Sequence, residues 1–348
     1  MKRSYSLDLI RLFLAYVITL FHFDHMIPPG PTATVQIFFV ISGYFLARKY
    51  YARSHEDRGA SYSPLRYTLD HARSFYPHCI LAAALFLLYV LARAVLVFLG
   101  SPSAQGLWEM VQLIYDQLPD ALFLQTSYQY AANLNSPTWQ ISALVIAGYF
   151  VYALLCYDEK LSRTILFPGA VIMAQSILAD CDDLFGRIGP IFLPLLRAFA
   201  PLCMGVLTCC FSRSTYCARL KQSRILFNIL TLLALPMMIL FEDRNGLHLI
   251  WSALLILGCT DPDSILERLL GHKCFAGCAK LSFVIYLNHA LIGRMYINII
   301  SKLIMKVCIV LSDTMNCVVY LVILTLACLL LMQIMDRLTA RRKEGARS

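Results

Sequence analysis

The 348-residue chain contains few charged residues. Asp, Glu, Lys and Arg together make up 15% of it, whereas hydrophobic residues make up 59%. Soluble domains carry about 25% charged and about 45–50% apolar residues. A soluble globule of this length could not bury so much apolar surface. The shortage of charge therefore excludes a cytosolic enzyme, a disordered chain and a secreted disulfide scaffold.

Several familiar sequence patterns are also missing. The chain has no internal repeat, no low-complexity tract and no glycine-rich phosphate-binding loop. It lacks the short alternating segments of an outer-membrane barrel as well. Thirteen cysteines are present, but most fall in apolar segments or in links expected on the cytoplasmic side, which argues against a disulfide framework. The remaining class is a multi-pass helical membrane protein.

Long apolar segments are abundant. A bilayer core of about 30 Å requires about 20 apolar residues in a helix, and we place ten such segments at 7–23, 33–51, 76–100, 138–156, 164–179, 190–211, 224–241, 247–260, 280–300 and 317–335. The sequence therefore predicts an all-α integral membrane protein, a bundle of about ten transmembrane helices. We expect residues 1–348 to form one integral-membrane domain without an appended soluble domain.

The basic residues are distributed unevenly between the two sides of this arrangement. Of 30 Lys and Arg residues, 22 fall in the terminal segments and links on one side and four on the other. The positive-inside rule then places both termini in the cytoplasm and the protein in the cytoplasmic (inner or plasma) membrane. The net charge of +9 is explained by the basic residues on the side expected to be cytoplasmic, so it does not indicate a nucleic-acid partner. We expect the lipid bilayer as a partner and no nucleic acid. The link 101–137, on the opposite side, has no Lys or Arg, and we expect a helix along the membrane surface there.

The first apolar segment carries a polar stripe. Inserting an ionisable residue into the bilayer costs about 2.5–3.5 kcal/mol, so such a residue usually has a functional or structural role there. Asp8 and Arg11 are three residues apart on one helical face, and His22 lies about 16 Å further along that face. Such a stripe should face the bundle interior or a water-filled cavity. The simpler alternative is an interfacial Asp8–Arg11 ion pair and an interfacial histidine.

The stripe is the first of several sequence blocks. It is followed by Phe-Phe-Val-Ile-Ser-Gly-Tyr-Phe-Leu at 38–46, Pro-Thr-Trp at 137–139, Arg197 with Gly205, and Leu-Ser-Phe-Val-Ile-Tyr-Leu-Asn-His at 281–289. In order and spacing these blocks resemble membrane acyltransferase family 3, the inner-membrane O-acyltransferases. The chain departs from the family pattern at Gln36, where an acidic residue is common. Arg73 is also one place away from the arginine expected before Pro77.

The resemblance implies a reaction and roles for the stripe. An acyl group, most often acetyl, would pass from cytoplasmic acyl-CoA to a hydroxyl of a cell-envelope carbohydrate or similar acceptor, with no permanently bound cofactor. His22 would be the general base, a task that neutral histidine can perform. Arg11 would hold phosphate or carbonyl groups of the donor, and Asp8 would orient Arg11 or a histidine.

Further residues are candidates for binding donor or acceptor, namely Ser42, Arg73, Trp139, Arg197, Tyr286 and His289. Ser42 could instead be a nucleophile or, with Gly43, allow close helix packing. Trp139 could anchor the chain at the membrane interface. Tyr286 could instead be a packed aromatic ring, and His289 an interfacial histidine. Arg93 and Arg294 lie near span ends and are expected to extend toward the interface.

Other classes of function remain open from the sequence. His22, Asp24 and His25 could hold a metal with His289, and His272 lies beside Cys274 and Cys278, but neither set has the spacing of a zinc site. We therefore expect no metal. A transporter of a polar solute is the main alternative; transporters often show inverted repeats, and none is found here. A non-catalytic sensor built on the same frame is the third.

Overall fold

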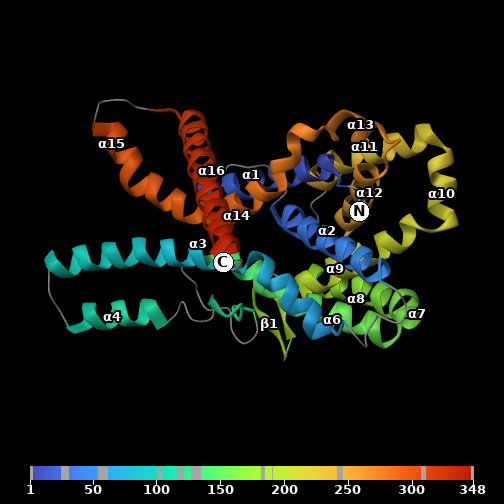
Figure 1. The fold of residues 1–348 in the computed structure, drawn as a ribbon, viewed down its shortest axis with the longest axis horizontal. Coiled ribbons are helices and arrows are strands. Elements are labelled where there is room, and N and C mark those ends of the chain that lie inside the picture. Colours follow the sequence, from blue (N-terminus) through green and yellow to red (C-terminus); the bar gives the residue numbers. More distant parts are fainter. Residues whose placement is uncertain are drawn as a thin grey trace.

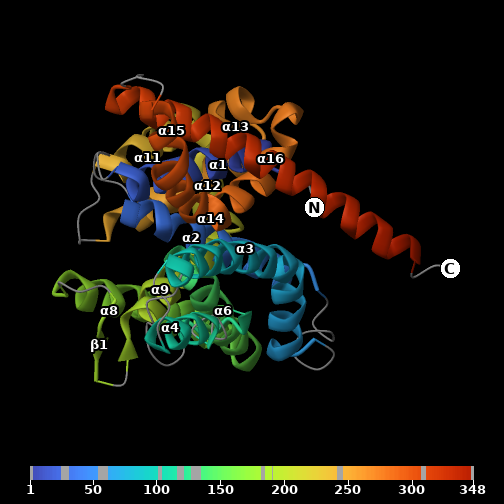
Figure 2. The same ribbon diagram turned by 90° about the vertical axis from the view of Figure 1, so that its left-hand side faces the viewer.

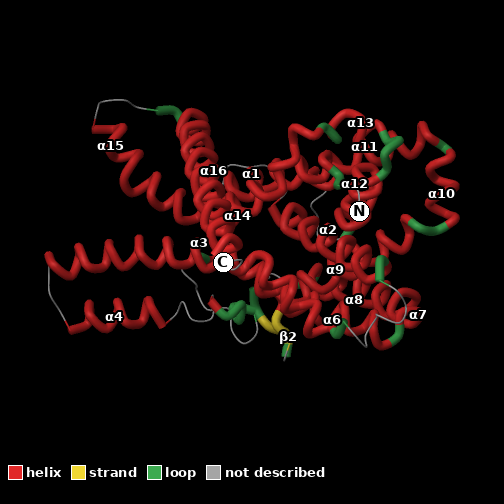
Figure 3. Tube along the Cα trace, viewed as in Figure 1, coloured by secondary structure: helices red, strands yellow, loops and turns green. Residues whose placement is uncertain are grey.

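The computed structural model describes residues 3–24, 31–53, 62–100, 104–115, 121–126, 135–181, 185–189, 191–240, 246–306 and 311–345. The described chain is almost entirely helical, which confirms the all-α prediction (Figure 3). Its one sheet is the antiparallel pair β1 (Arg187–Ile188) and β2 (Ile191–Phe192). This short hairpin leads into the ninth helix.

The helices follow one another with short connections. The first part contains α1 (Tyr5–Asp24), α2 (Pro31–Tyr51), α3 (Pro64–Gly100), α4 (Ala104–Tyr115), η1 (Ser136–Thr138), α6 (Trp139–Tyr157), α7 (Glu159–Leu161), η2 (Ser162–Leu166) and α8 (Phe167–Ala179). After the hairpin come α9 (Leu193–Ser212), α10 (Thr215–Gln222), α11 (Arg224–Leu240), α12 (Leu247–Thr260), α13 (Ile265–Leu270), η3 (Lys273–Gly277), α14 (Cys278–Met295), η4 (Tyr296–Ile300), α15 (Ser301–Lys306) and α16 (Asp313–Gly345).

Each of the ten expected apolar segments forms a helix at its place in the chain. The largest difference is α3, which begins at Pro64, so that the second half of the expected polar link is helical as well. Pro77 lies inside α3 without ending it. Packing accounts for the extra turns, because the Tyr67 ring is buried and stacks on Tyr152 of α6 at 4.3 Å between centroids.

Not every one of these helices meets the requirements of a membrane span. Seven of the described helices are long and apolar enough to cross a bilayer, and α10 with α11, bent by 100°, would make an eighth. Helix α12 has 14 residues, or about 21 Å, which is shorter than the hydrocarbon core. The expected count of about ten spans is therefore not confirmed, and the orientation of the termini stays a prediction.

Helices α2 and α9 pack with their backbones in contact. A Cβ atom added at Gly43 would lie 2.0 Å from the Leu202 carbonyl oxygen, and one at Gly205 would lie 2.1 Å from the Val40 carbonyl oxygen. Small residues permit this approach where apolar side chains alone provide no hydrophobic driving force between helices. The pair, with α6 and α12 beside it, forms the larger apolar core.

A second core holds α1 against α14 and α16. Ala15, Ile285 and Leu324, one from each helix, are buried in it. The Tyr16 hydroxyl and the Thr325 hydroxyl add a hydrogen bond of 2.8 Å between α1 and α16. Helix α16 then projects away from the other helices toward the C-terminus (Figure 2). This core sets the two helices that carry most of the predicted site residues side by side.

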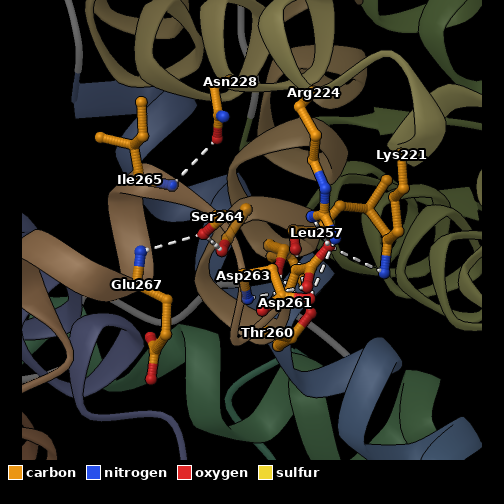
Figure 4. Close-up of polar contacts among 12 residues, drawn as sticks. Lys221, Arg224, Asn228, Leu257, Thr260, Asp261, Asp263, Ser264, Ile265 and Glu267 are labelled. Carbon is orange, nitrogen blue, oxygen red and sulfur yellow. Dashed lines mark hydrogen bonds and ion pairs between the residues drawn. The ribbon is translucent and has the colours of Figure 1, made fainter.

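Polar contacts fix the bend between α10 and α11. The Lys221 ammonium lies 3.3 Å from the carboxylate of Asp261, which follows α12, and Arg224 pairs with Asp263 at 2.9 Å. The backbone N–H of Ile265 donates to the Asn228 side chain at 2.9 Å (Figure 4). These contacts join the α10–α11 pair to the connection between α12 and α13.

Helix α3 extends well beyond the bundle. Its far half runs beside α4, and the helical extension of α14 through η4 and α15 leaves the bundle on the same side (Figure 1). A helix in the link 101–137 is thus present as α4, packed along α3, and its expected position along the membrane surface stays a prediction.

Candidate functional site

A cavity of about 550 Å³ lies between α1, α2, α3, α6 and α14. Arg11 is one of its lining residues, and we refer to it as the Arg11 cavity. Four phenylalanines give it an apolar wall, namely Phe38, Phe39, Phe75 and Phe283. Its polar lining includes Arg3, Ser42, His71, Gln140, Lys280 and Tyr286. The cavity thus combines an apolar body with three cationic side chains, of which Arg3 is paired with Asp8 and Lys280 with Asp336.

Arg11 points across this cavity toward α2. Its guanidinium carbon lies 5.3 Å from the centroid of the Phe45 ring, a cation–π distance. Asp8 is buried, and its ion pair within the described structure is with Arg3, at 2.5 Å. The ion pair of Asp8 is thus with Arg3, just before α1, and not with Arg11. The expected role of Asp8 in orienting Arg11 or a histidine stays a prediction.

His22 lies at the opposite end of α1, on a different cavity of about 210 Å³. His289, Pro137, Gly293, Arg294 and Tyr320 also line this cavity, which we call the His22 cavity. The rings of His22 and His289 are 5.3 Å apart between centroids. The structure thus brings together two histidines that are far apart in the sequence.

The orientation of His289 is fixed by a hydrogen bond. Its side chain is buried, and Nδ1 lies 2.7 Å from the backbone carbonyl oxygen of Tyr286. Since a carbonyl only accepts, Nδ1 carries the hydrogen and Nε2 keeps its lone pair. In the described structure this buried Nε2 has no hydrogen-bond partner, so it is a free acceptor on the wall of the His22 cavity.

Tyr286 separates the two cavities. Its ring lines the Arg11 cavity, and its hydroxyl donates a hydrogen bond to the carbonyl oxygen of Pro137. Pro137 in turn lines the His22 cavity. The partition between the two spaces is therefore one tyrosine side chain and the backbone that it binds.

Of two further predicted binding residues, one lines the Arg11 cavity and one does not. Arg73 is exposed on α3, where it pairs with Asp70 at 3.9 Å, and it does not line either cavity. Ser42 does line the Arg11 cavity, but its hydroxyl donates to the Phe38 carbonyl at 2.7 Å, within its own helix. The close packing at Gly43 bears out the packing interpretation of this sequence pair.

Trp139 and Arg197 form a separate buried group. The Arg197 guanidinium carbon lies 5.1 Å from the Trp139 ring centroid and 5.0 Å from that of Phe185. Trp139 and Arg197 are both buried and are not among the residues that line the two cavities. The interface position considered for Trp139 is not what the structure shows, because Arg197 and Phe39 cover its ring.

Sequence reasoning missed most of the lining contributed by α3. His71, Ser74 and His78 all face the Arg11 cavity and are spaced by three and four residues. This helical periodicity was visible in the sequence, but the polar residues before Pro77 were assigned to a link. Arg294, expected to extend toward the interface, instead lines the His22 cavity beside His289.

The metal alternatives find no support in the described part of the chain. No group of three or more His, Cys, Asp or Glu side chains is close enough there to hold a metal ion. His272, Cys274 and Cys278 are all described and do not form such a group. His25, invoked for the other metal alternative, lies outside the described residues.

Apolar helices of spanning length, with a cavity at each end of one polar helical face, define a multi-pass membrane protein. Comparison with known families identifies the family. The sequence model of acyltransferase family 3, described as an acyltransferase domain, matches residues 4–336, and the chain belongs to this family. The protein is thus an acyltransferase. Neither the curated proteins nor the solved structures include a match to it.

Proposed function

We propose that the protein transfers an acyl group from acyl-CoA in the Arg11 cavity to a hydroxyl group in the His22 cavity. The observation that carries this proposal is the position of Tyr286, which lines the Arg11 cavity and donates a hydrogen bond to Pro137, a residue that lines the His22 cavity. A donor bound in one space and an acceptor bound in the other would meet at that side chain.

The Arg11 cavity suits a coenzyme A thioester. Arg3, Arg11 and Lys280 can hold phosphate oxygens, and the phenylalanine wall can take the pantetheine arm and the acyl group. Arg11 and His22 are about 16 Å apart along α1, so an extended arm can bring the thioester toward His22. The positive-inside rule places the Arg11 end on the cytoplasmic side, where acyl-CoA is found.

The reaction at the His22 cavity is a substitution at the thioester carbonyl. The neutral imidazole of His22 takes the proton of the acceptor hydroxyl while that oxygen attacks the carbonyl carbon. The new C–O bond forms, the C–S bond breaks, and the thiolate of coenzyme A leaves with the proton returned by His22. The products are an ester and free coenzyme A.

His289 would position His22 and the acceptor. Its Nε2 keeps a lone pair because the other nitrogen is bound to the Tyr286 carbonyl, and the residue lines the His22 cavity. A hydrogen bond from the acceptor or from the His22 ring to this atom would fix the geometry of proton transfer. Tyr286 and His289 therefore act together, since the backbone of one fixes the ring of the other.

The finer assignments rest on the sequence pattern. The donor is acetyl-CoA, the acceptor is a cell-envelope carbohydrate, and the protein resides in the cytoplasmic membrane. The resemblance to the O-acetyltransferase branch and the distribution of basic residues support these assignments.

The test uses membranes that contain the wild type or a variant, supplied with isotope-labelled acetyl-CoA. Base-labile label in envelope glycans and lipids is followed by mass spectrometry. His22→Ala should lower the transfer rate at least ~10²-fold, the usual contribution of a general base. His272→Ala, which removes an exposed histidine before η3, is the matched control and should keep the wild-type rate.

Two results would overturn the proposal. One is full transfer activity in a correctly inserted His22→Ala variant. The other is no labelled product with acetyl-, succinyl- or longer acyl-CoA, together with protein-dependent uptake of a polar solute into vesicles. The second result would establish the transporter alternative.

A further inference from the structure

A third cavity of about 370 Å³ lies where the far half of α3 meets α4 and the end of α14. Its polar lining consists of Tyr89 and Arg93 from α3, Gln105 and Glu109 from α4, and Arg294 from α14. We call it the Arg93 cavity. Arg294 lines both this cavity and the His22 cavity, so the two spaces are neighbours across one side chain.

Hydrogen bonds join α3 to the end of α14 at this junction. The Tyr89 hydroxyl donates to the Arg294 backbone carbonyl at 3.4 Å, and the Asn298 amide donates to the Tyr89 hydroxyl at 3.2 Å and to the same carbonyl at 2.8 Å. Arg93 is one helical turn beyond Tyr89, on the same face of α3. The contact between α3 and α14 therefore brings the backbone positions of both arginines to the same cavity.

The charge in this cavity is not balanced. Arg93 and Arg294 bring two positive charges against the single carboxylate of Glu109. Glu109 accepts a hydrogen bond from Gln105 at 3.2 Å, and within the described structure no ion pair joins it to either arginine. The Arg294 guanidinium rests on the Phe86 ring at 4.9 Å, which covers its face and leaves its N–H edge available. Two such edges in one cavity suit a carboxylate or a phosphate, which arginine binds in a bidentate manner.

We infer that the Arg93 cavity binds the anionic group of the acceptor, and that the acceptor is an acidic saccharide carrying a carboxylate or a phosphate. This inference rests on the proposed function. His289 and Arg294 are five residues apart on α14, about 7.5 Å along the axis, a separation that one sugar residue can span. An acidic sugar with its anion at Arg294 and Arg93 would present a hydroxyl to His22.

The first test measures binding without requiring turnover. The purified full-length protein is treated with phenylglyoxal, which modifies arginine, and the modification of each arginine is followed by mass spectrometry. Methyl glucuronide, inorganic phosphate and the neutral methyl glucoside are the probes. We expect the glucuronide, the phosphate or both to slow modification of Arg93 and Arg294 at least threefold, with no effect of the glucoside. Exposed Arg187, in β1, is the internal control and should react at one rate throughout.

The two anions distinguish the source of the charge. Protection by the glucuronide alone identifies a carboxylate acceptor, and protection by phosphate alone identifies a phosphorylated one. Equal rates with all probes, or equal protection of Arg187, would overturn the inference.

The second test uses transfer kinetics with labelled acetyl-CoA and the matched pair of glucuronide and glucoside acceptors. The ratio of kcat/KM for the acidic over the neutral acceptor should fall at least tenfold in Arg294→Gln and Arg93→Gln. Arg93→Lys should recover part of it. Lys302→Gln, which removes an exposed charge from α15, is the control and should keep the wild-type ratio.

The outcomes separate this inference from the proposed function. Transfer that depends on His22 but has no preference for the acidic acceptor, without arginine protection, would overturn the anion site alone. Arginine protection without His22-dependent transfer would overturn the proposed function and leave an anion-binding site.

Discussion

Tyr286 is the side chain on which the proposed reaction depends most directly. Its ring lines the Arg11 cavity, its hydroxyl binds the carbonyl of Pro137, and its own carbonyl orients His289. The sequence could suggest a base and a donor-binding residue, but it could not show that one tyrosine lies between the two cavities. The side chain of Tyr286 lies between the proposed donor and acceptor sites, and its backbone carbonyl orients His289.

The hydroxyl of Tyr286 can be removed without changing its ring. In Tyr286→Phe the hydrogen bond to Pro137, worth about 0.5–1.5 kcal/mol, is lost and the ring is held less firmly across the partition. We expect the transfer rate to fall about 2–10-fold, the range that this energy gives. Hydrolysis of acyl-CoA should rise relative to transfer because water reaches the thioester more readily.

The measurement compares released coenzyme A thiol with ester product. Tyr16→Phe is the matched control, because it removes a tyrosine hydrogen bond between α1 and α16 outside both cavities. An unchanged ratio of hydrolysis to transfer in Tyr286→Phe would show that the Tyr286 hydroxyl does not limit the access of water to the thioester.

At the scale of elements, the α2–α9 pair forms the frame against which the site is built. The two backbones touch at Gly43 and Gly205, so α2 can present Ser42 and the phenylalanines of its other face to the Arg11 cavity. The extended α3 matters in the same way, since its first turns add His71 and Ser74 to that cavity.

A methyl group at either glycine should therefore be costly. In Gly43→Ala and Gly205→Ala the new carbon would meet backbone atoms, which cannot move aside, and overpacking of this kind costs about 1–3 kcal/mol. We expect a clear fall in the apparent Tm of the purified protein in detergent. Gly169→Ala on α8, where a Cβ would meet no atom within 4 Å, is the control and should leave Tm unchanged or raise it. Equal Tm values for all three variants would contradict the packing described here.

For the whole molecule, the distribution of charges predicts an arrangement in the bilayer. The positive-inside rule predicts that η3 lies in the cytoplasm and α4 outside. Cys274 in η3 is exposed, as is Gln105 in α4. These two positions therefore report on opposite sides of the membrane.

Labelling of intact and permeabilised cells with an impermeant maleimide tests this arrangement. Cys274 should react only after permeabilisation, whereas a cysteine introduced by Gln105→Cys should react in intact cells. Peptide mass spectrometry identifies the labelled site, and a Cys274→Ser variant provides the blank. Labelling of Cys274 in intact cells would show that the orientation is the opposite of the predicted one. The donor would then reach Arg11 from the other side of the membrane.

The sequence by itself determined the class of protein, the places of its helices and the two ends of the polar face. These follow from local properties: hydrophobic segments of bilayer length, the helical repeat that aligns Arg11 with His22, and the family pattern that the match to residues 4–336 confirms. The length of α3 escaped prediction, because burial of Tyr67 against α6 overrides the polar character of its first turns.

Only the tertiary structure decided which side chains meet. Asp8 pairs with Arg3 and Arg73 with Asp70 through local contacts that the sequence spacing did not select. Arg197 lies against Trp139 and His289 faces His22 through contacts between segments distant in the chain. The same is true of Arg294, which sequence position alone assigned to the interface. Its place between two cavities depends on the packing of α3 against α14, a long-range contact that a single sequence does not encode in any local pattern.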